Sequence, residues 1–465
     1  MNDDKNLEDI ELEILRNAVD KAQENKGKQK IRSPEIKNII HIVEDFLRRK
    51  QLICYGGTAI NNILPEKDQF YNKDVELPDY DFFSPNALID AKNLADIYIN
   101  KGYEDVEAKT SIHQGTYKIY VNFIPVADIT QLTSNLFKAI SKDAIKVNGI
   151  KYAPPNFLRM GMYLELSRPK GDVSRWEKVL KRLILLNKNY PLKNQNCKEI
   201  DFQREFKDNS NKRKKVYYIV RNSIIDQGLI LFGGFASSMY ARYMPAHKRR
   251  QIAAIPDFDV LSKNPQKSAE IIKDTLQKKG IKNVTIYKQP PIGELIGTHY
   301  EVVVGEDTVC FIYEPIACYS YNIINIDNKK IRIATIDTML SFYLAFIYAN
   351  RLYYDKERII CMAQYLFEVQ ENNRLQQKGL LRRFTINCYG KQETLEEIRA
   401  NKARLFRQLK TNPESKMYQK YFLRYVPLNK TKKRKIRNTR RKREKEIKKI
   451  SFDPTKTRKI LNIEY

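Results

Sequence analysis

Apolar residues recur at helical spacing in two segments near the N-terminus. The first segment covers residues 7–23, and its apolar positions are mostly three or four residues apart. The second begins at Ser33 and Pro34, a serine cap followed by proline at the first helical position, and its apolar positions continue to Leu47. Residues 1–48 are therefore predicted to form a helical N-terminal segment.

Further along the chain, one pattern of apolar and polar positions occurs twice in the same order. Each copy has an apolar run, a glycine pair, a helix-like segment, an Asp-x-Asp pair among β-prone residues, and a later strand-like alternation. The glycine pairs are Gly56 with Gly57 and Gly233 with Gly234, offset by 177 residues, and the acidic pairs are offset by 178 residues. A register kept over this length indicates an internal duplication.

The duplication predicts an α+β fold with two tandem domains of the same ancestry, each built from a mixed sheet packed with helices. A lysine-rich polar stretch separates the two copies, and the composition changes again after the second copy. The predicted segments are the N-terminal helices (1–48), a first domain (49–190), a linker (191–215), a second domain (216–370), a C-terminal helical or irregular extension (371–429) and a basic tail (430–465).

The chain is strongly basic, since 84 Lys and Arg residues against 55 Asp and Glu residues leave a net charge of +29. This balance argues against an enzyme of small neutral substrates and favours an anionic partner. Sixteen basic and four acidic residues fall within residues 430–465, and a charge run of this kind is usually solvated. The apolar content of 42% excludes a wholly disordered chain.

Neither a membrane span nor a cysteine framework is expected. No stretch reaches the roughly 18 uninterrupted apolar residues that a spanning helix needs, and the first residues are acidic where a signal peptide is basic. The six cysteines contain no Cys-x-x-Cys pair, and the four histidines are scattered. We therefore expect a soluble intracellular protein with reduced, buried thiols and with neither a disulfide framework nor a zinc site.

The first copy has carboxylates that suit a divalent cation. Residues i and i+2 of a strand share one face, so Asp79 and Asp81 should project together. Asp128 ends a strand-like run over residues 117–127 and is the obvious third carboxylate. Oxygen donors of this kind suit Mg²⁺ or Mn²⁺, and a two-ion site needs a further carboxylate from a neighbouring strand. The three aspartates are therefore the predicted metal ligands.

The glycine pair of the first copy lies between a strand-like run and a helix-like run. Glycines at such a turn let backbone amides approach a phosphate at a helix N-terminus. Gly56, Gly57 and Thr58 are therefore predicted to contact a phosphate, the last through its hydroxyl. A glycine pair or an Asp-x-Asp pair alone is common in turns and at strand edges, whereas their conjunction with a third aspartate is far more specific.

These residues resemble the nucleotidyltransferase superfamily that includes DNA polymerase beta and the poly(A) polymerases, whose signature is a glycine turn, an Asp-x-Asp pair and a distant third aspartate. The segments Tyr-Gly-Gly-Thr-Ala-Ile-Asn-Asn-Ile-Leu-Pro (55–65) and Pro-Asp-Tyr-Asp-Phe-Phe (78–83) are similar to the catalytic subunits of poly(A) polymerases from large nucleocytoplasmic DNA viruses, the mimivirus-like kind. The likeness covers about residues 35 to 370. The 21 residues between the glycine pair and the acidic pair exceed the usual superfamily spacing but fit the viral subgroup.

The resemblance implies two tandem polymerase-beta-like nucleotidyltransferase domains and a template-independent transfer of AMP from ATP to the 3′-hydroxyl of mRNA, with release of pyrophosphate. In the residue roles that it implies, Gly56, Gly57 and Thr58 hold the triphosphate, Asp79 and Asp81 bind both of two Mg²⁺ or Mn²⁺ ions, and Asp128 binds the ion that activates the RNA hydroxyl. It also implies the cytoplasmic viral factory of an infected cell as the location, with packaging in the virion as an open point.

Several alternatives stay open. The same carboxylates serve uridylyl and CCA-adding transferases, and two spent domains could form a non-catalytic RNA-binding or processivity subunit. A homodimer and a viral accessory subunit are both compatible with the duplication. The basic residues predicted to contact RNA phosphates are Lys248, Arg249 and Arg250 in the second copy and Lys432, Lys433, Arg434, Arg440 and Arg441 in the tail.

The second copy is expected to be degenerate and structural, with a retained active site as the alternative. It keeps the glycine and acidic pairs Gly233, Gly234, Asp257 and Asp259. Its nearest third carboxylate, Glu314, is about two positions out of step with Asp128, and Phe235 stands in the place of Thr58.

Overall fold

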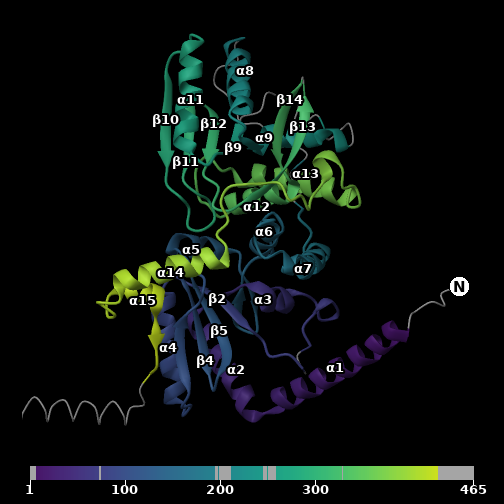
Figure 1. The fold of residues 1–465 in the computed structure, drawn as a ribbon, viewed down its shortest axis with the longest axis vertical. Helices are drawn as coiled ribbons and strands as arrows, with labels where there is room; N and C mark the ends of the chain where they lie inside the picture. Colours follow the sequence, from purple (N-terminus) through teal and green to yellow (C-terminus); the bar gives the residue numbers. More distant parts are fainter. Residues whose placement is uncertain are drawn as a thin grey trace, which may run out of the picture.

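The computed structural model describes residues 7–72, 75–193, 197, 211–244, 249, 258–326 and 328–427. Two β-sheets, each with helices packed against it, lie one above the other along the longest axis of the molecule (Figure 1). Within the described residues each sheet has eight strands and mixes parallel with antiparallel pairs. The predicted α+β class with mixed sheets and helices is confirmed.

The first sheet contains the first copy of the repeated pattern. Its strands, in spatial order, are β16 (Arg424–Tyr425), β3 (Val106–Thr110), β4 (Thr116–Val121), β5 (Ile124–Gln131), β2 (Tyr80–Ser84), β1 (Ile53–Cys54), β7 (Ile150–Tyr152) and β6 (Ile145–Val147). The central strand β2 lies parallel to β5 on one side and antiparallel to β1 on the other. The acidic pair and Asp128 therefore come from neighbouring strands.

The run predicted as one strand over residues 117–127 is instead a hairpin. Strand β4 turns at Asn122 and Phe123 and returns as β5, with both turn residues at positive φ. Such a two-residue turn matches the twist of paired strands, and asparagine tolerates positive φ well. Asp128 consequently lies in the middle of β5, with β4 and β2 on its two sides.

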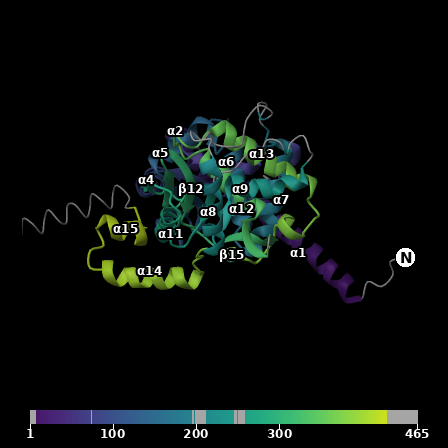
Figure 2. The same cartoon turned by 90° about the horizontal axis from the view of Figure 1, so that it is seen from above.

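The first unit also contains seven described helices. They are α1 (Leu7–Arg32), α2 (Pro34–Lys50), α3 (Gly56–Ile63), α4 (Ala87–Asn100), α5 (Ser134–Lys142), α6 (Pro155–Leu166) and α7 (Trp176–Asn189). The helix predicted from the serine and proline signal is confirmed as α2, which begins at Pro34 and buries Ile39 and Val43 in the core. Helix α1 projects away from the body of the molecule (Figures 1 and 2).

The second sheet repeats the order and strand directions of the first. Its strands, in spatial order, are β10 (Val284–Gln289), β11 (His299–Val304), β12 (Asp307–Tyr313), β9 (Phe258–Leu261), β8 (Ile230–Phe232), β14 (Lys329–Ala334), β13 (Tyr319–Ile326) and β15 (Cys388–Tyr389). Its helices are α8 (Asn211–Asp226), α9 (Gly233–Tyr240), α11 (Pro265–Lys278), α12 (Ile336–Phe346) and α13 (Lys356–Asn372). Strands β10 to β13 correspond in position and direction to β3 to β6, and each glycine pair begins a short helix after a short strand.

Corresponding helices meet where the two units join. Helix α6 of the first unit packs against α12 of the second, and all residues of α12 are buried. The backbone amide of Ser320 donates to the Ser167 carbonyl at 2.8 Å, and the Tyr163 hydroxyl bonds the Gln370 side-chain amide at 2.9 Å. The two units are therefore joined by a continuous core crossed by specific polar contacts.

A C-terminal segment reaches both sheets. Strand β15 pairs with β13 at the edge of the second sheet, and β16 pairs with β3 at the edge of the first. Between them lie α14 (Leu395–Leu409) and α15 (Lys416–Phe422), on the outside of the molecule in Figure 2. The described chain also contains short 3₁₀ turns at Glu66–Asp68, Val173–Arg175, Ala241–Tyr243 and Gly379–Leu381. By covering one edge of each sheet, this segment shields strands that would otherwise be open to pairing.

The prediction of reduced thiols is wrong for four cysteines. The disulfide pairs are Cys197 with Cys361 and Cys318 with Cys388. They join residues 164 and 70 positions apart, and the second pair is brought together by the antiparallel pairing of β13 with β15. Sequence spacing cannot reveal such pairs because the fold determines which cysteines become neighbours. Cys54 and Cys310 are buried and belong to neither of these disulfides.

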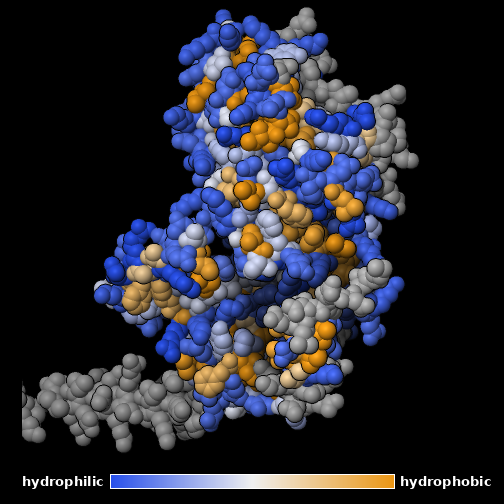
Figure 3. Space-filling model, turned by 45° about the vertical axis from the view of Figure 1, so that its right-hand side comes forward, coloured by the Kyte–Doolittle hydropathy of each residue, from blue (hydrophilic) through white to orange (hydrophobic). Residues whose placement is uncertain are grey.

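The outer surface is mainly polar on the face drawn in Figure 3, where hydrophilic residues surround scattered apolar ones. A search of the described helices for an apolar stretch able to cross a bilayer finds none.

The second unit contains a buried histidine that should make stability depend on pH. The His299 ring is fully buried, accepts or donates a hydrogen bond at 2.8 Å to the Tyr353 hydroxyl, and stacks on Tyr313. Burial, with a smaller contribution from the charge of Arg351, lowers the pKa of His299 from 6.5 to about 4, while the hydrogen bond to the Gly297 carbonyl partly opposes this change. The unfolded chain therefore binds this proton more readily than the native protein as the pH falls from 6.5 towards 4.

We expect the free energy of unfolding to decrease over this pH range by up to about 3 kcal/mol because of His299 alone. Urea unfolding of wild type and His299→Gln at pH 7, 6, 5 and 4 measures this contribution as the difference between the two pH slopes. His113→Gln, at an exposed position, is the matched control and should keep the wild-type slope. Parallel slopes for wild type and His299→Gln would contradict the assignment.

Candidate active site

Three carboxylates gather on one face of the first sheet. Asp81 on β2 is the direct neighbour of Asp128 on β5 in the parallel register, so their side chains project to the same side. Asp79 lies two residues before Asp81, just outside β2, and its charge acts on Asp81, so it is close to the pair. The structure thus brings together the three aspartates that the sequence singled out.

Burial and neighbouring negative charge raise the pKa of Asp79 and Asp81. Burial raises the pKa of Asp81 to about 7, with further contributions from the charges of Asp79 and Asp128. Burial also raises the pKa of Asp79, and Asp128 adds to this effect. A cluster in which ionised carboxylates repel one another in a partly buried place is stabilised by a cation.

A lysine already provides one positive charge at this cluster. Lys118 on β4 is the antiparallel neighbour of Asp128, and its Nζ lies 2.5 Å from the carboxylate Oδ2. The sequence analysis did not identify Lys118, because only the hairpin register brings the two residues together. Alternation along β4 could have suggested which face Lys118 occupies, but not its partner.

The donor chemistry of the cluster fits a divalent cation. No group of three or more His, Cys, Asp or Glu side chains in the described part of the chain is arranged to hold a metal ion as it stands. The mutual repulsion of the aspartates and the pairing of Asp128 with Lys118 nevertheless mark this as the place where positive charge is favourable. Carboxylate oxygens are the ligands that Mg²⁺ and Mn²⁺ prefer.

The glycine turn lies directly against the acidic cluster. Helix α3 begins at Gly56, whose φ is +73°, and a Cβ there would lie 2.6 Å from Oδ2 of Asp81. A Cβ at Gly57 would lie 2.4 Å from the Tyr71 hydroxyl and 2.9 Å from the Arg182 guanidinium nitrogens. Glycine is thus required twice by close approach, and once also by backbone conformation.

Thr58 is used differently from the predicted phosphate contact. Its side chain is buried, and its hydroxyl donates to the backbone carbonyl of Asp79 at 2.6 Å. This bond ties the start of α3 to the residue that leads into β2. In the structure Thr58 therefore positions the acidic pair relative to the glycine turn.

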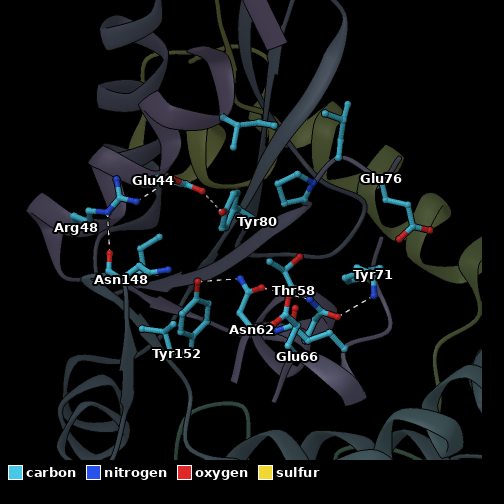
Figure 4. A pocket seen from close by; sticks show the side chains of 17 residues that line it. Glu44, Arg48, Thr58, Asn62, Glu66, Tyr71, Glu76, Tyr80, Asn148 and Tyr152 are labelled. Atoms are coloured by element: carbon cyan, nitrogen blue, oxygen red, sulfur yellow. Dashed lines mark hydrogen bonds and ion pairs between the residues drawn. The ribbon is translucent and has the colours of Figure 1, made fainter. Parts of the chain in front are cut away.

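A cavity of about 610 Å³ lies behind the turn, on the side of β2 to which Tyr80 points (Figure 4). The Tyr80 hydroxyl donates to Glu44 at 2.7 Å, and Asn62 donates to the Tyr152 hydroxyl at 3.0 Å. Thr58 lines this cavity, whereas none of the three aspartates does. Because alternate residues of a strand point to opposite faces, the acidic cluster and this cavity lie on different sides of the strand.

The second unit retains the turn, and its described residues place no third carboxylate beside Asp259. Gly233 has φ of +70°, and a Cβ there would lie 2.0 Å from Oδ2 of the buried Asp259. The residue beside Asp259 in the parallel register, the counterpart of Asp128, is the buried Phe311. Glu314 lies three positions beyond Phe311, after the end of β12, so it is out of step with Asp128 as the sequence indicated, although by three positions and not two.

Aromatic packing occupies the corresponding region of the second unit. Phe235, at the position of Thr58, packs against Phe258 with ring centroids 5.5 Å apart, and Phe258 stacks on Tyr217. Asp257 of the predicted second acidic pair lies outside the described residues. Among the described residues, the second unit thus has a hydrophobic contact where the first has a third carboxylate.

Most of the basic residues predicted to contact RNA cannot be placed. Arg249 is exposed, and its guanidinium donates to the backbone carbonyls of Met244 at 2.7 Å and Arg242 at 3.2 Å. The others, Lys248, Arg250, Lys432, Lys433, Arg434, Arg440 and Arg441, lie outside the described residues.

The segment that holds the site is similar to known proteins. Residues 41–172 match the sequence model described as "Poly(A) polymerase catalytic subunit". A "Putative poly(A) polymerase catalytic subunit" of African swine fever virus (isolate Pig/Kenya/KEN-50/1950) is 34% identical over 171 residues, which cover 36% of this chain and 36% of that protein. A protein of the same description from Acanthamoeba polyphaga mimivirus is 29% identical over 261 residues, 54% of this chain and 43% of that protein.

The likeness in fold extends further than the likeness in sequence. The crystal structure of the Megavirus polyadenylate synthase matches with a TM-score of 0.76 and 21% identity, covering 92% of this chain and 86% of that one. The sequence matches, in contrast, span about a third of the length of the African swine fever virus relative and less than half of the mimivirus relative. The matched segment 41–172 holds the glycine turn and all three aspartates, and over that segment the chain is similar to the poly(A) polymerase catalytic subunits that its motifs resemble.

Proposed function

We propose that the chain is the catalytic subunit of a viral poly(A) polymerase, which transfers AMP from ATP to the 3′-hydroxyl of mRNA and releases pyrophosphate. The observation that carries this proposal is the position of Asp81 beside Asp128 on parallel strands, with Asp79 two residues earlier and a glycine turn in contact. The relatives named as poly(A) polymerase catalytic subunits support the same function.

In this proposal Asp79, Asp81 and Asp128 hold two Mg²⁺ or Mn²⁺ ions. When bound, the ions neutralise phosphate charge and lower the pKa of the attacking hydroxyl. The RNA 3′-oxygen forms a bond to the α-phosphorus of ATP and loses its proton, while the bond from that phosphorus to the bridging oxygen breaks and pyrophosphate leaves. Lys118 holds the Asp128 carboxylate in place before substrate arrives.

The glycine turn is proposed to receive the triphosphate. Backbone amides at the start of α3 are unsatisfied within the helix and carry the positive end of its dipole. Gly56 and Gly57 leave no side chain between these amides and the acidic cluster. Thr58 supports the site by holding the backbone of Asp79.

We infer that both units are polymerase-beta-like nucleotidyltransferase domains produced by duplication, with the second one degenerate. The shared strand order supports the common origin, and Phe311 in the place of a carboxylate supports the loss of catalysis. The second unit then serves as a packed support for the first, through α12 against α6.

An extension assay tests the function directly. Purified protein is incubated with a short labelled RNA, Mg²⁺ or Mn²⁺, and each of the four nucleoside triphosphates separately. We expect extension with ATP and its loss in EDTA. Extension by UTP or CTP would instead indicate a uridylyl or CCA-adding transferase, and failure with every nucleotide would indicate a non-catalytic RNA-binding subunit.

Assembly and location are proposed from the same relationship. RNA is the expected partner, and the candidates for a protein partner are a second copy of the chain and a viral accessory subunit. Light scattering of the purified protein with and without RNA decides whether it self-associates. The proposed location is the cytoplasmic viral factory of the infected cell, and fractionation of purified virions decides whether the protein is also packaged.

A further inference from the structure

Helix α7 carries a row of basic residues that the catalytic proposal has not used. Arg175 at its start, Lys178 and Arg182 are separated by three and four residues, so they share one face of the helix. Lys181 lies on a different face, where it pairs with Glu177 at 2.6 Å and is 72% exposed. The three residues Arg175, Lys178 and Arg182 are called the basic face below.

Arg182 lies directly over the glycine turn. Its two terminal nitrogens lie 2.9 Å from the position of a Cβ at Gly57, and one of them donates to the Tyr71 hydroxyl at 2.6 Å. The guanidinium carbon lies 4.9 Å from the ring centroid of Phe70 and 5.5 Å from that of Tyr71. Its rigid fork is thus held beside the helix N-terminus while bonded to a neutral phenol, which leaves its charge for an anion.

The other two residues of the basic face lie near the acidic cluster. The charge of Arg175 acts on Asp81, and the charge of Lys178 acts on Asp79. Arg175 also bonds Glu165 of α6, with its Nε 3.2 Å from the carboxylate.

The second unit helps to hold α7 in this position. Trp176 packs against Phe384 with ring centroids 5.9 Å apart, and its indole donates to the Glu165 carbonyl at 3.1 Å. Phe384 follows Arg383, whose guanidinium bonds the buried Asp337 of α12 at 2.6 Å. A buried ion pair in the second unit is therefore linked through two aromatic rings to the start of the basic face.

We propose that Arg175, Lys178 and Arg182 form a phosphate-binding face that recognises the β- and γ-phosphates of the incoming nucleoside triphosphate opposite the glycine turn. This inference rests on the proposed function and names the residues that would bind its leaving group. The fork of Arg182 suits two phosphate oxygens, and Lys178 contributes a point charge. Pyrophosphate consists of these β- and γ-phosphates, so the same residues hold it before it is released.

Binding measurements separate this role from a structural one. A fluorescent ATP analogue is bound to the protein in EDTA and displaced with ATP or with inorganic tripolyphosphate. The affinities obtained are compared for wild type, Lys178→Ala, Arg182→Ala and Arg182→Lys. We expect Lys178→Ala and Arg182→Ala to weaken both ligands about tenfold each, as for loss of one charged hydrogen bond. Arg182→Lys should fall between wild type and Arg182→Ala. Lys181→Ala is the matched control and should remain within twofold of wild type.

The exposed Lys178 keeps the test decisive even if an Arg182 variant unfolds. If Lys178→Ala and Arg182→Lys bind tripolyphosphate as tightly as wild type, the proposal is wrong. The basic face would then serve only to balance the negative charge of the aspartates. The proposed function has a separate test, because it is refuted if the wild type extends RNA with no nucleotide. Even in that case, the tripolyphosphate measurement still shows whether the basic face binds phosphate. In the extension assay the same two variants should increase KM for ATP more than they decrease kcat.

Discussion

Asp81→Asn should reduce AMP addition to RNA by at least about 10²-fold, the range found when one group that stabilises transition-state charge is removed. Asp81 is the central member of the cluster, beside Asp128 in the sheet and two residues after Asp79. The amide retains the shape of the side chain but cannot neutralise a cation. The measurement is the initial rate of extension of a labelled RNA with ATP and Mg²⁺.

Asp259→Asn is the matched control, because it makes the same change at the corresponding strand position of the second unit. Its extension rate should remain within about twofold of wild type if the second unit is degenerate. Comparable losses in both variants would mean that the second unit takes part in catalysis.

Thermal melting distinguishes the loss of a catalytic charge from the loss of the folded state. In the absence of divalent ions, Asp81→Asn should melt at or above the wild-type temperature near pH 8. The raised pKa of Asp81, about 7, means that its ionised form is unfavourable in the native state, so its contribution to stability is lost as the pH rises through that value. Replacing it with a neutral amide removes this unfavourable charge. A large decrease in melting temperature would instead identify Asp81 as a structural residue.

Gly56→Ala should nearly abolish extension, with a decrease in stability of about 1–2 kcal/mol from the left-handed backbone conformation. The additional loss of activity comes from the contact between the new Cβ and Asp81, which would be only 2.6 Å apart. The Asp81 carboxylate must then move away from the turn and from Asp128. Extension rate and urea unfolding are measured on the same preparation.

Gly280→Ala separates the two effects. Gly280 has φ of +81°, and a Cβ there would meet nothing within 4 Å. This variant should show a similar loss of stability while retaining most of the activity. Equal activity losses in the two variants would mean that backbone strain, and not the approach to Asp81, explains the requirement for glycine.

Much of the site could be predicted because its chemistry depends on local spacing. The two-residue period of a strand puts Asp79 and Asp81 on one side, and a glycine pair between a strand and a helix is a local signal as well. Asp128 was chosen because it follows a strand-like run, and the family resemblance implied the same role. Its true setting, in the middle of a hairpin strand opposite Lys118, depends on a turn that the alternating pattern did not reveal.

Most of the contributions that were missed depend on pairing between distant parts of the chain. Arg182 meets Tyr71 across 111 residues, and the disulfide of Cys197 with Cys361 spans 164. The sequence indicated that Glu314 is about two positions out of step with Asp128, whereas the register between β9 and β12 makes the offset three. One residue of error in register reverses the face to which a side chain points.

The sequence by itself determined the α+β class, the repeated order of motifs, the residue types of the acidic cluster and the glycine turn, since each follows from short-range periodicity and backbone sterics. Only the tertiary structure decided which carboxylate faces Asp81, what stands in its place in the second unit, and which basic helix lies over the turn. The reason is physical: strand register and helix docking minimise the free energy of the whole core, and no local segment contains that information.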